Sequence, residues 1–141
     1  MINKIIDGIS VAISSKFGDL YEIYTESIEQ GLNEPCFSIV CINHKIEQVV
    51  GKRYFRMNEF CIHYFPSSEE KGFECNDVAE TLMDILEMIT VDGDMCRGTD
   101  MEYYIEDNVL SFMVNYDMYV RRETEPMTEM EHLSQNTNLK G

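Results

Sequence analysis

Apolar residues near the amino terminus recur at helical spacing. One stripe is formed by residues three or four positions apart, namely Ile2, Ile5, Ile6, Ile9, Ala12, Ile13 and Phe17. Gly18 follows directly, at the position where glycine commonly ends a helix. The pattern predicts an amphipathic helix over residues 2–17, whose apolar stripe packs against a sheet or another helix.

Two runs typical of β-strands come next. Residues 20–28 alternate between faces and predict a strand. A polar turn over residues 30–35 ends at a proline, which is tolerated at the first position of a strand. Residues 36–42 are almost continuously apolar and β-branched, which is typical of a strand covered on both faces.

A third strand is predicted over residues 57–65. It places Phe60, Ile62 and Tyr64 on one face, and Glu59, Cys61 and His63 on the other. The segment Gly51–Arg56 lies between this strand and the preceding one and predicts a basic, aromatic turn. We interpret residues 35–66 as the centre of a sheet whose connecting turn reaches toward another surface.

A second helix is predicted over residues 77–89. Its apolar stripe consists of Val78, Leu82, Ile85, Leu86 and Ile89. Asn76 is a favourable N-cap, and Asp77 is favourable in the first turn because of the helix dipole. The polar segment 90–94 is expected to end this helix.

The last third of the chain again has the pattern of strands. Residues 101–106 predict a strand that is followed by a turn at Asp107–Asn108. Residues 110–120 then alternate more regularly than any other segment and predict one long antiparallel strand. Residues 123–141 are polar and acidic and predict either a mobile tail or a segment that orders on a partner.

The order of these elements indicates an α+β fold. One helix, three strands, a second helix and two strands predict a mainly antiparallel sheet with two helices packed on one face. We therefore expect one domain over residues 1–122, followed by an acidic C-terminal tail over residues 123–141.

Composition narrows the classes of function. The chain has 141 residues and a formal net charge of −15, which disfavours binding to phosphate backbones. Five cysteines without a Cys-x-x-Cys pair fit a reducing compartment. We expect no membrane span, since no apolar run approaches roughly 20 residues. We expect no signal peptide, because Asp7 interrupts the first apolar segment.

Potential metal ligands do not have the spacing of a metal site. Cys36 and Cys41 are an odd number of positions apart, so on a regular strand they face opposite sides. Cys41 and Cys61 could face each other across paired strands, but buried free cysteines are common core residues. Segment 92–98 faintly resembles a calcium loop, but Arg97 holds the position that requires glycine. We predict neither a metal nor a cofactor.

No catalytic motif is recognised in the sequence. The glycines are scattered singly, so neither a P-loop nor a dinucleotide-binding fingerprint can form. Cys61 and His63 would lie on one sheet face, but the sequence identifies no oxyanion donor and no orienting acid beside them. Structural roles are favoured for both residues, and no catalytic residue is predicted.

A positive patch supplies the candidate functional residues. It comprises Lys45, Lys52, Arg53, Tyr54, Phe55 and Arg56, with Glu47 as its only acid. Aromatic residues beside arginine are favoured in interface hot spots. Two interpretations remain open. The patch is either a solvated hairpin tip whose aromatics fold back onto the core, or an arm that binds acidic neighbours head to tail and so forms a ring.

Four stretches of the chain resemble a known family. They are IYTESIEQGLNEPCFSI, GKRYFRMNEFCIHYFP, ECNDVAETL and VNYDMYV, and together they resemble the small tail terminator proteins of tailed phages and prophages from Gram-positive hosts. Related phage-tail-like bacteriocins carry similar proteins. The resemblance covers roughly residues 1–121 and keeps the order and spacing of the stretches.

The resemblance implies a structural function and an α+β fold. Proteins of this family form a ring, usually a hexamer, that ends polymerisation of the tail tube and offers a surface to neck or sheath proteins. The implied partners are further copies of the chain, the tail tube protein, and sheath or neck proteins. The implied location is the tail of a virion or tail-like particle assembled in the host cytoplasm. No catalytic residue is implied.

Other functions remain open from the sequence. A neck or head-completion protein is also a small ring former, and the sequence separates it poorly from a terminator. An inhibitor that mimics nucleic acid would need its acids arrayed along one face, whereas here they are spread over every element. A small thiol enzyme ranks below both.

Overall fold

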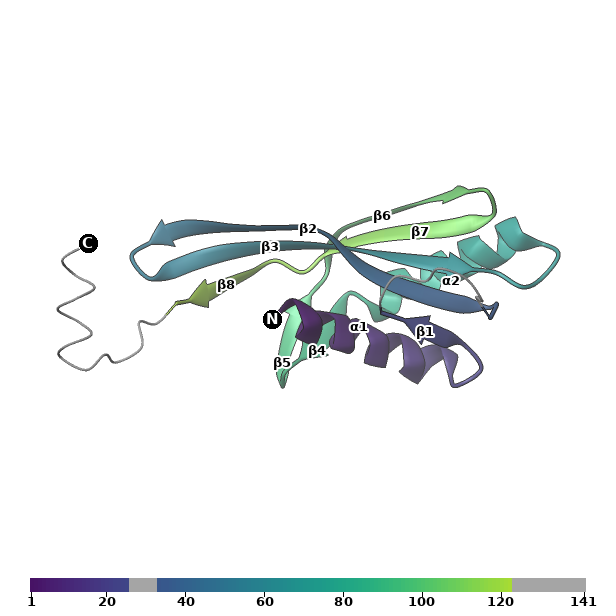
Figure 1. Ribbon diagram of the computed structural model, residues 1–141, viewed down its shortest axis with the longest axis horizontal. Coiled ribbons are helices and arrows are strands. Elements are labelled where there is room, and N and C mark those ends of the chain that lie inside the picture. The colour runs from purple at the N-terminus through teal and green to yellow at the C-terminus, as the bar shows by residue number, and fades with distance from the viewer. Residues whose placement is uncertain (26–32, 123–141) are drawn as a thin grey trace.

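The computed structural model describes residues 1–25 and 33–122. Two helices and eight strands form an α+β fold, as predicted. The main sheet contains β1 (Glu22–Tyr24), β2 (Cys36–Val50), β3 (Arg53–Phe65), β6 (Thr99–Glu106), β7 (Val109–Asn115) and β8 (Met118–Arg121). Its strand order is β1-β2-β3-β7-β6, and β8 lies beside the first part of β3 (Figure 1). Every pair is antiparallel except β1 with β2.

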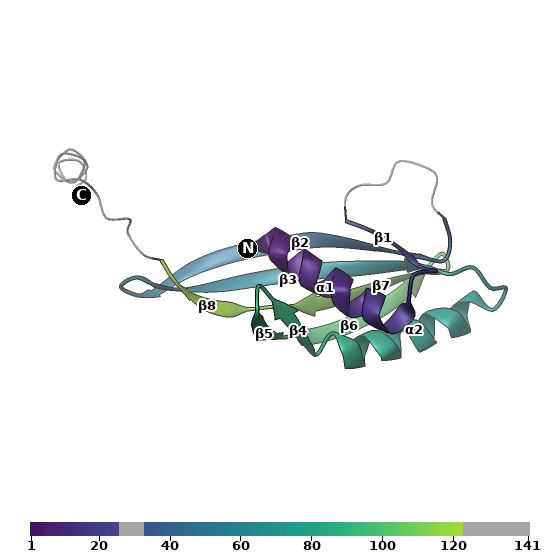
Figure 2. The same ribbon diagram turned by 90° about the horizontal axis from the view of Figure 1, so that it is seen from below.

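Both helices cover one face of this sheet. Helix α1 (Ile2–Phe17) packs against β2, and α2 (Lys71–Ile85) packs against β6 and β7 (Figure 2). The buried core between the layers includes Ile5, Ile9, Ile13, Phe37, Ile39, Phe60, Ile62, Tyr64, Leu82, Leu86, Leu110, Phe112 and Val114. The predicted arrangement of a mainly antiparallel sheet with two helices on one face is therefore confirmed.

The first helix has the predicted limits. Ile5, Ile9 and Ile13 are fully buried, and Gly18 ends the helix with a φ of 87°. Gly8 lets α1 approach β4 (Met88–Val91), because a Cβ at Gly8 would lie 2.6 Å from the carbonyl oxygen of Thr90. The apolar stripe of α1 thus contacts both the main sheet and a second, smaller one.

The predicted limits of the second helix are wrong at both ends. The helix begins at Lys71, and its first buried residue is Cys75. Asn76, the predicted N-cap, therefore lies inside the helix. Its side-chain oxygen accepts a hydrogen bond from the Tyr103 hydroxyl. The helix ends at Ile85. Beyond it, β4 and β5 (Asp94–Arg97) form a hairpin that was not predicted from the sequence. Residues 88–91 are alternately exposed and buried, and this two-residue period is typical of a strand.

The predicted turn Gly51–Arg56 is also wrong. Strand β2 continues to Val50 and β3 starts at Arg53, so the turn consists of Gly51 and Lys52, with Gly51 at a φ of 53°. The alternation that marks a half-buried strand is absent from residues 42–50, because this part of the hairpin is largely exposed.

The predicted long strand 110–120 is interrupted at Tyr116–Asp117. Asn58, fully buried on β3, inserts at this break. Its side-chain amide donates to the carbonyl oxygen of Tyr116 at 2.8 Å, and its backbone N–H donates to Asp117 Oδ1 at 3.1 Å. As a result, β7 pairs with the second part of β3 and β8 pairs with the first part.

The remaining predicted strands have mixed outcomes. Strand β1 covers the centre of the predicted run 20–28, and residues 26–32 lie outside the described part of the chain. The predicted turn at Asp107–Asn108 is confirmed, and both residues have positive φ. The predicted tail, residues 123–141, also lies outside the described residues.

Glu74 fixes the loop between β3 and α2. Its carboxylate accepts hydrogen bonds from the Tyr64 hydroxyl, from the Ser67 N–H at 3.2 Å and from the Ser68 N–H at 2.9 Å. Burial alone would raise the pKa of Glu74, but hydrogen bonds to Ser68, Tyr64 and Ser67 outweigh it and hold the pKa below the ordinary value of 4.5. The charged carboxylate is therefore the form that the fold prefers.

Replacing Glu74 with glutamine is expected to destabilise the protein at neutral pH by about 1–2 kcal/mol, because charge-assisted hydrogen bonds are lost. The pKa is lower in the folded state, so this stabilisation is present above pH 4.5 and is lost as pH falls through the folded-state value. Urea unfolding between neutral pH and about pH 3 measures both effects. Glu80→Gln, at an exposed position of the same helix, is the control. Equal acid sensitivity of the two variants would contradict this role for Glu74.

Candidate functional site

The β2–β3 hairpin projects beyond the helices as an arm (Figures 1 and 2). We define the arm as residues 42–57 together with residues 118–122. A β-bulge between Cys41 and Asn43 lies where the hairpin leaves the body, and β8 adds a third strand by pairing with Arg53–Arg56. The N–H of Arg122 donates to the carbonyl oxygen of Lys52 at 2.8 Å, which ties the end of β8 to the tip of the hairpin.

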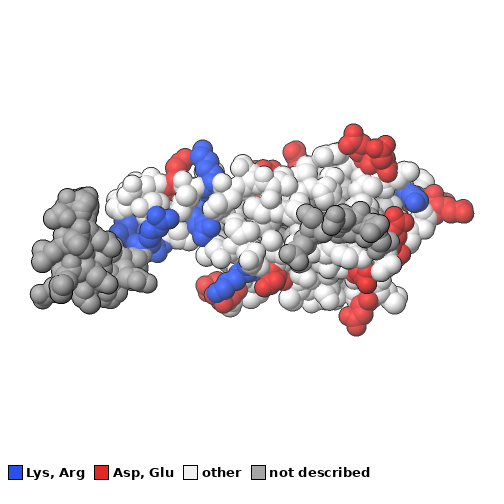
Figure 3. Space-filling model, in the orientation of Figure 1, with Lys and Arg blue, Asp and Glu red and all other residues white. Residues whose placement is uncertain are grey.

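Positive charge is concentrated on the arm. Six of the eleven Lys and Arg residues of the chain lie there, namely Lys45, Lys52, Arg53, Arg56, Arg121 and Arg122. Glu47 is the single acid of the arm. Figure 3 shows the basic side chains gathered over the arm and most acidic side chains over the body on the face in view. The described part of the molecule therefore has a positive end and a negative body.

Two of these basic residues were missed from the sequence. Arg121 and Arg122 follow the alternating run and are far from residues 45–56 along the chain. Pairing of β8 with β3 brings them to the same arm. The available signal was the doubled arginine directly after a predicted strand, but the sequence did not show which strand would be its neighbour.

The aromatic residues of the arm pack against β8 and its arginines. Phe55 and Tyr119 have ring centroids 4.8 Å apart, and the guanidinium of Arg53 lies 5.1 Å from the Tyr119 centroid. On the other face, the guanidinium of Arg122 lies 4.6 Å from the Tyr54 centroid. These contacts hold the arginines on the arm by cation–π attraction, and Tyr54 and Phe55 lie among them outside the central core.

A hydrogen-bond chain connects the arm to the body. Arg56 Nη2 lies 3.3 Å from His44 Nε2, and His44 Nδ1 lies 2.7 Å from Asn58 Oδ1. Arginine only donates, so Nε2 accepts and Nδ1 carries the proton that is donated to Asn58. Asn58 in turn donates to the Tyr116 carbonyl oxygen. Arg56 is thus positioned by contacts that end in the buried core.

The arm also exposes apolar surface. Val50 is 71% exposed and Ile42 is 50% exposed, and Ile46 and Val49 are exposed as well. Ile46, Val49 and Val50 lie among the basic residues toward the tip of the hairpin, and Ile42 lies at its base. Exposed apolar side chains together with arginine and aromatic residues are typical of protein interfaces.

Cys61 and His63 come together on the helix-free face of the sheet. The Cys61 sulfur lies 3.6 Å from His63 Nε2, and His63 Nδ1 lies 3.2 Å from the Ser111 hydroxyl. Burial raises the pKa of the Cys61 thiol, and burial lowers the pKa of His63. Both shifts favour a neutral thiol beside a neutral imidazole at neutral pH. A nucleophilic cysteine requires the reverse, namely a thiolate stabilised by a cation.

The cysteine pairing considered from the sequence is not the observed one. Cys41 pairs directly with Phe60, whereas Cys61 pairs with Val40. Burial raises the pKa of Cys36 to about 11. Among the described residues, no group of three or more His, Cys, Asp and Glu side chains could hold a metal ion.

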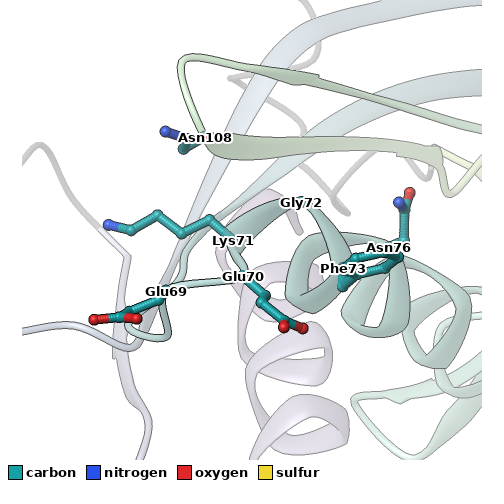
Figure 4. Close-up of a pocket in the computed structure, with 7 residues that line it drawn as sticks. All are labelled: Glu69, Glu70, Lys71, Gly72, Phe73, Asn76 and Asn108. Carbon is teal, nitrogen blue, oxygen red and sulfur yellow. The ribbon is translucent and has the colours of Figure 1, made fainter.

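A shallow cleft lies at the end of the body opposite the arm (Figure 4). It is lined by Glu69, Glu70, Lys71, Gly72, Phe73, Asn76 and Asn108 and has a volume of about 570 Å³. Phe73 is 72% exposed. The lining combines two acids with one lysine and contains neither a cysteine nor a histidine, so the cleft provides no nucleophile–base pair.

The fold and the site define a small α+β protein whose sheet extends into a basic arm. The sequence model of the family described as phage tail terminator protein matches residues 4–128, so the chain belongs to the phage tail terminator family. This family is structural, and its role is to terminate the phage tail. Membership implies contacts with other tail proteins and a place in the virion tail.

No curated protein matches the chain significantly. Within the described residues, neither helix is long and apolar enough to cross a membrane.

Proposed function

We propose that the chain terminates the tail as a hexameric ring on the end of the tail tube. In this state it ends polymerisation of the tube and offers a surface to neck or sheath proteins. Family membership supports the tail-terminating role. The observation that carries the ring is the separation of charge between a basic arm and an acidic body (Figure 3).

The separation of charge favours a head-to-tail contact. The arm carries Lys52 and Arg53 at its tip, and the body of the next copy presents acids on α1, α2 and β6. A contact between two different surfaces of identical copies repeats from copy to copy, and it closes into a ring when the rotation permits. The exposed apolar residues Ile42 and Val50 would be buried in the same contact.

Reversing the charge of the arm tip is expected to prevent ring formation. In the variant Lys52→Glu with Arg53→Glu, two positive charges facing acids are replaced by two negative ones. Light scattering after size exclusion, with and without purified tail tubes, measures the assembled fraction. We expect at least a tenfold loss of assembly at low salt, which corresponds to about 1.4 kcal/mol. Salt of about 1 M should weaken wild-type assembly as well, because it shortens the screening length to about 3 Å.

The matched control places the same charge change on the body. Lys4→Glu with Lys16→Glu alters two exposed lysines of α1, and the Lys4–Asp92 surface ion pair that it breaks is worth at most about 1 kcal/mol. This control should assemble as the wild type does. If the arm variant also assembles normally at low salt, the arm is not the contact. A wild-type chain that remains a monomer and ignores tube ends would overturn the proposed function.

A further inference from the structure

Within the described residues, one edge of the arm has no partner strand over most of its length. Strand β1 pairs with β2 only at Cys36–Ser38. From Ile39 to Val50, no strand among the described residues pairs with the outer edge of β2. An open edge presents a row of backbone N–H and C=O groups and is a template for a strand from another chain. Proteins commonly shorten or cover such an edge, but this one extends to the arm tip.

The opposite edge of the sheet is acidic, and it too has no partner strand among residues 1–25 and 33–122. Strand β6 is the last strand of the sheet and pairs only with β7 in the described structure (Figure 1). It carries Asp100, Glu102 and Glu106 and contains no Lys or Arg. A register shift near Asp100 restricts the regular part of this edge to Glu102–Glu106. Tyr104, in the middle of it, is 52% exposed.

From these two edges we infer that β2 of one copy pairs with β6 of the next copy and continues the sheet across the junction. The inference rests on the proposed ring and names its contact. Because β2 and β6 lie on opposite sides of the sheet, each copy offers one edge and receives the other. Repetition of this junction closes a ring in which these edges are no longer free.

The facing charges fit this pairing. Lys45 is paired with Met57, which lies on the face of β3 that carries Cys61 and His63. Glu102 is paired with Met113, and Met113 is paired with Cys61. Residues paired across strands share a face, so Lys45 and Glu102 both lie on the helix-free face. In a continuous sheet they become neighbours of opposite charge.

The other open edges fit less well. The outer edge of β8 is flanked by Arg121 and Arg122, so pairing it with the arm of another copy would bring like charges together. Pairing β2 with β2 of a second copy is isologous. It would stop at a dimer and could not build a ring. Of these three edges, β8 is disfavoured by charge and β2 cannot build a ring, which leaves β6 as the partner of β2.

Two charge-reversed variants test the junction by mixing. The arm variant is Lys45→Glu with Lys52→Glu, and the edge variant is Glu102→Lys with Glu106→Lys. When either variant is present alone, every junction brings an arm and a β6 edge of the same charge together. We therefore expect at least a tenfold loss of assembly, measured by size exclusion with light scattering. In an equimolar mixture every junction between unlike copies has opposite charges again. The mixture should therefore recover assembly, in rings where the two variants alternate.

The control for the edge variant is Glu80→Lys with Asp84→Lys, which places the same charge change on exposed positions of α2. This control should assemble alone and should not restore the arm variant. Recovery on mixing also shows that both variants are folded. If the wild type forms rings and the edge variant alone assembles equally well, the β2–β6 junction is overturned and the proposed function remains intact. Wild-type chains that never assemble, with or without tubes, would overturn both.

Hydrogen exchange tests the strand pairing directly. The outward-pointing amides among residues 43–50 and 102–106, roughly every second one, should exchange at least about tenfold more slowly in the wild-type ring than in the free copy, because new backbone hydrogen bonds protect them. The amides of α2 are the internal reference. A ring without new protection at both edges would mean that side chains alone form the contact, and would overturn the inferred sheet.

Discussion

Asn58→Leu is expected to lower the free energy of unfolding by about 2–4 kcal/mol and to release β8 from the arm. Leucine branches at Cγ as asparagine does, but it lacks the hydrogen-bonding groups and is larger, so overpacking adds to the cost. The carbonyl oxygen of buried Tyr116 would lose the donor that now lies at 2.8 Å, and His44 would lose its acceptor at 2.7 Å. A buried polar group without a partner pays its full desolvation cost.

Urea unfolding measures the stability of the Asn58 variant, and hydrogen exchange at residues 118–121 reports whether β8 remains paired. Asn43→Leu is the matched control, because Asn43 is exposed on the same hairpin and its side chain makes no hydrogen bond within the described residues. We expect the control to stay within about 0.5 kcal/mol of the wild type. If both variants lose equal stability, the cost arises from leucine on the hairpin and not from the buried amide.

Gly98→Ala is expected to destabilise the protein by about 2–3 kcal/mol. A Cβ at this position would collide with the carbonyl oxygen of Leu86 and would lie 2.9 Å from Val114 Cγ2. Leu86 and Val114 are both fully buried, so neither can move without disturbing the core. The Gly98 N–H also donates to the Glu87 carbonyl oxygen at 2.7 Å, which fixes the distance between the two segments.

Gly72→Ala is the control for this substitution. Nothing lies within 4 Å of a Cβ built on Gly72, which is in α2. Alanine should stabilise this helix position by up to about 1 kcal/mol. Thermal or urea unfolding should therefore shift in opposite directions for the two variants. A small effect of Gly98→Ala would show that Leu86 and Val114 can separate at little cost.

The elements that were predicted well are those whose burial follows one period. The stripe of α1 is buried along its length, and β7 alternates because one face packs on the core. The end of α2 was misplaced because Ile85, Leu86 and Ile89 have the spacing of a helical stripe. Ile89 is indeed buried, but it belongs to strand β4. The interruption after β7 was missed because Tyr116 continues the alternation. The break depends on Asn58, which is distant in sequence.

The candidate site was predicted in part for a related reason. Lys45 to Arg56 form a visible cluster along the chain, and the structure places all six predicted residues on the arm. The arm itself was interpreted as a turn, because an exposed hairpin does not show a buried face. Arg121 and Arg122 complete the basic surface through pairing of β8 with β3, and pairing between distant strands has no local signature.

Strand β3 is shared by the body and the arm, and this makes assembly a check on folding. The basic surface combines residues 45–56 with Arg121 and Arg122, and these meet through β8, which follows β7 along strand β3. A copy with an incomplete body sheet therefore presents a smaller positive surface and a loose hairpin. Under the proposed function, such a defective copy competes poorly for a place in the ring, and the completed particle is enriched in correctly folded copies.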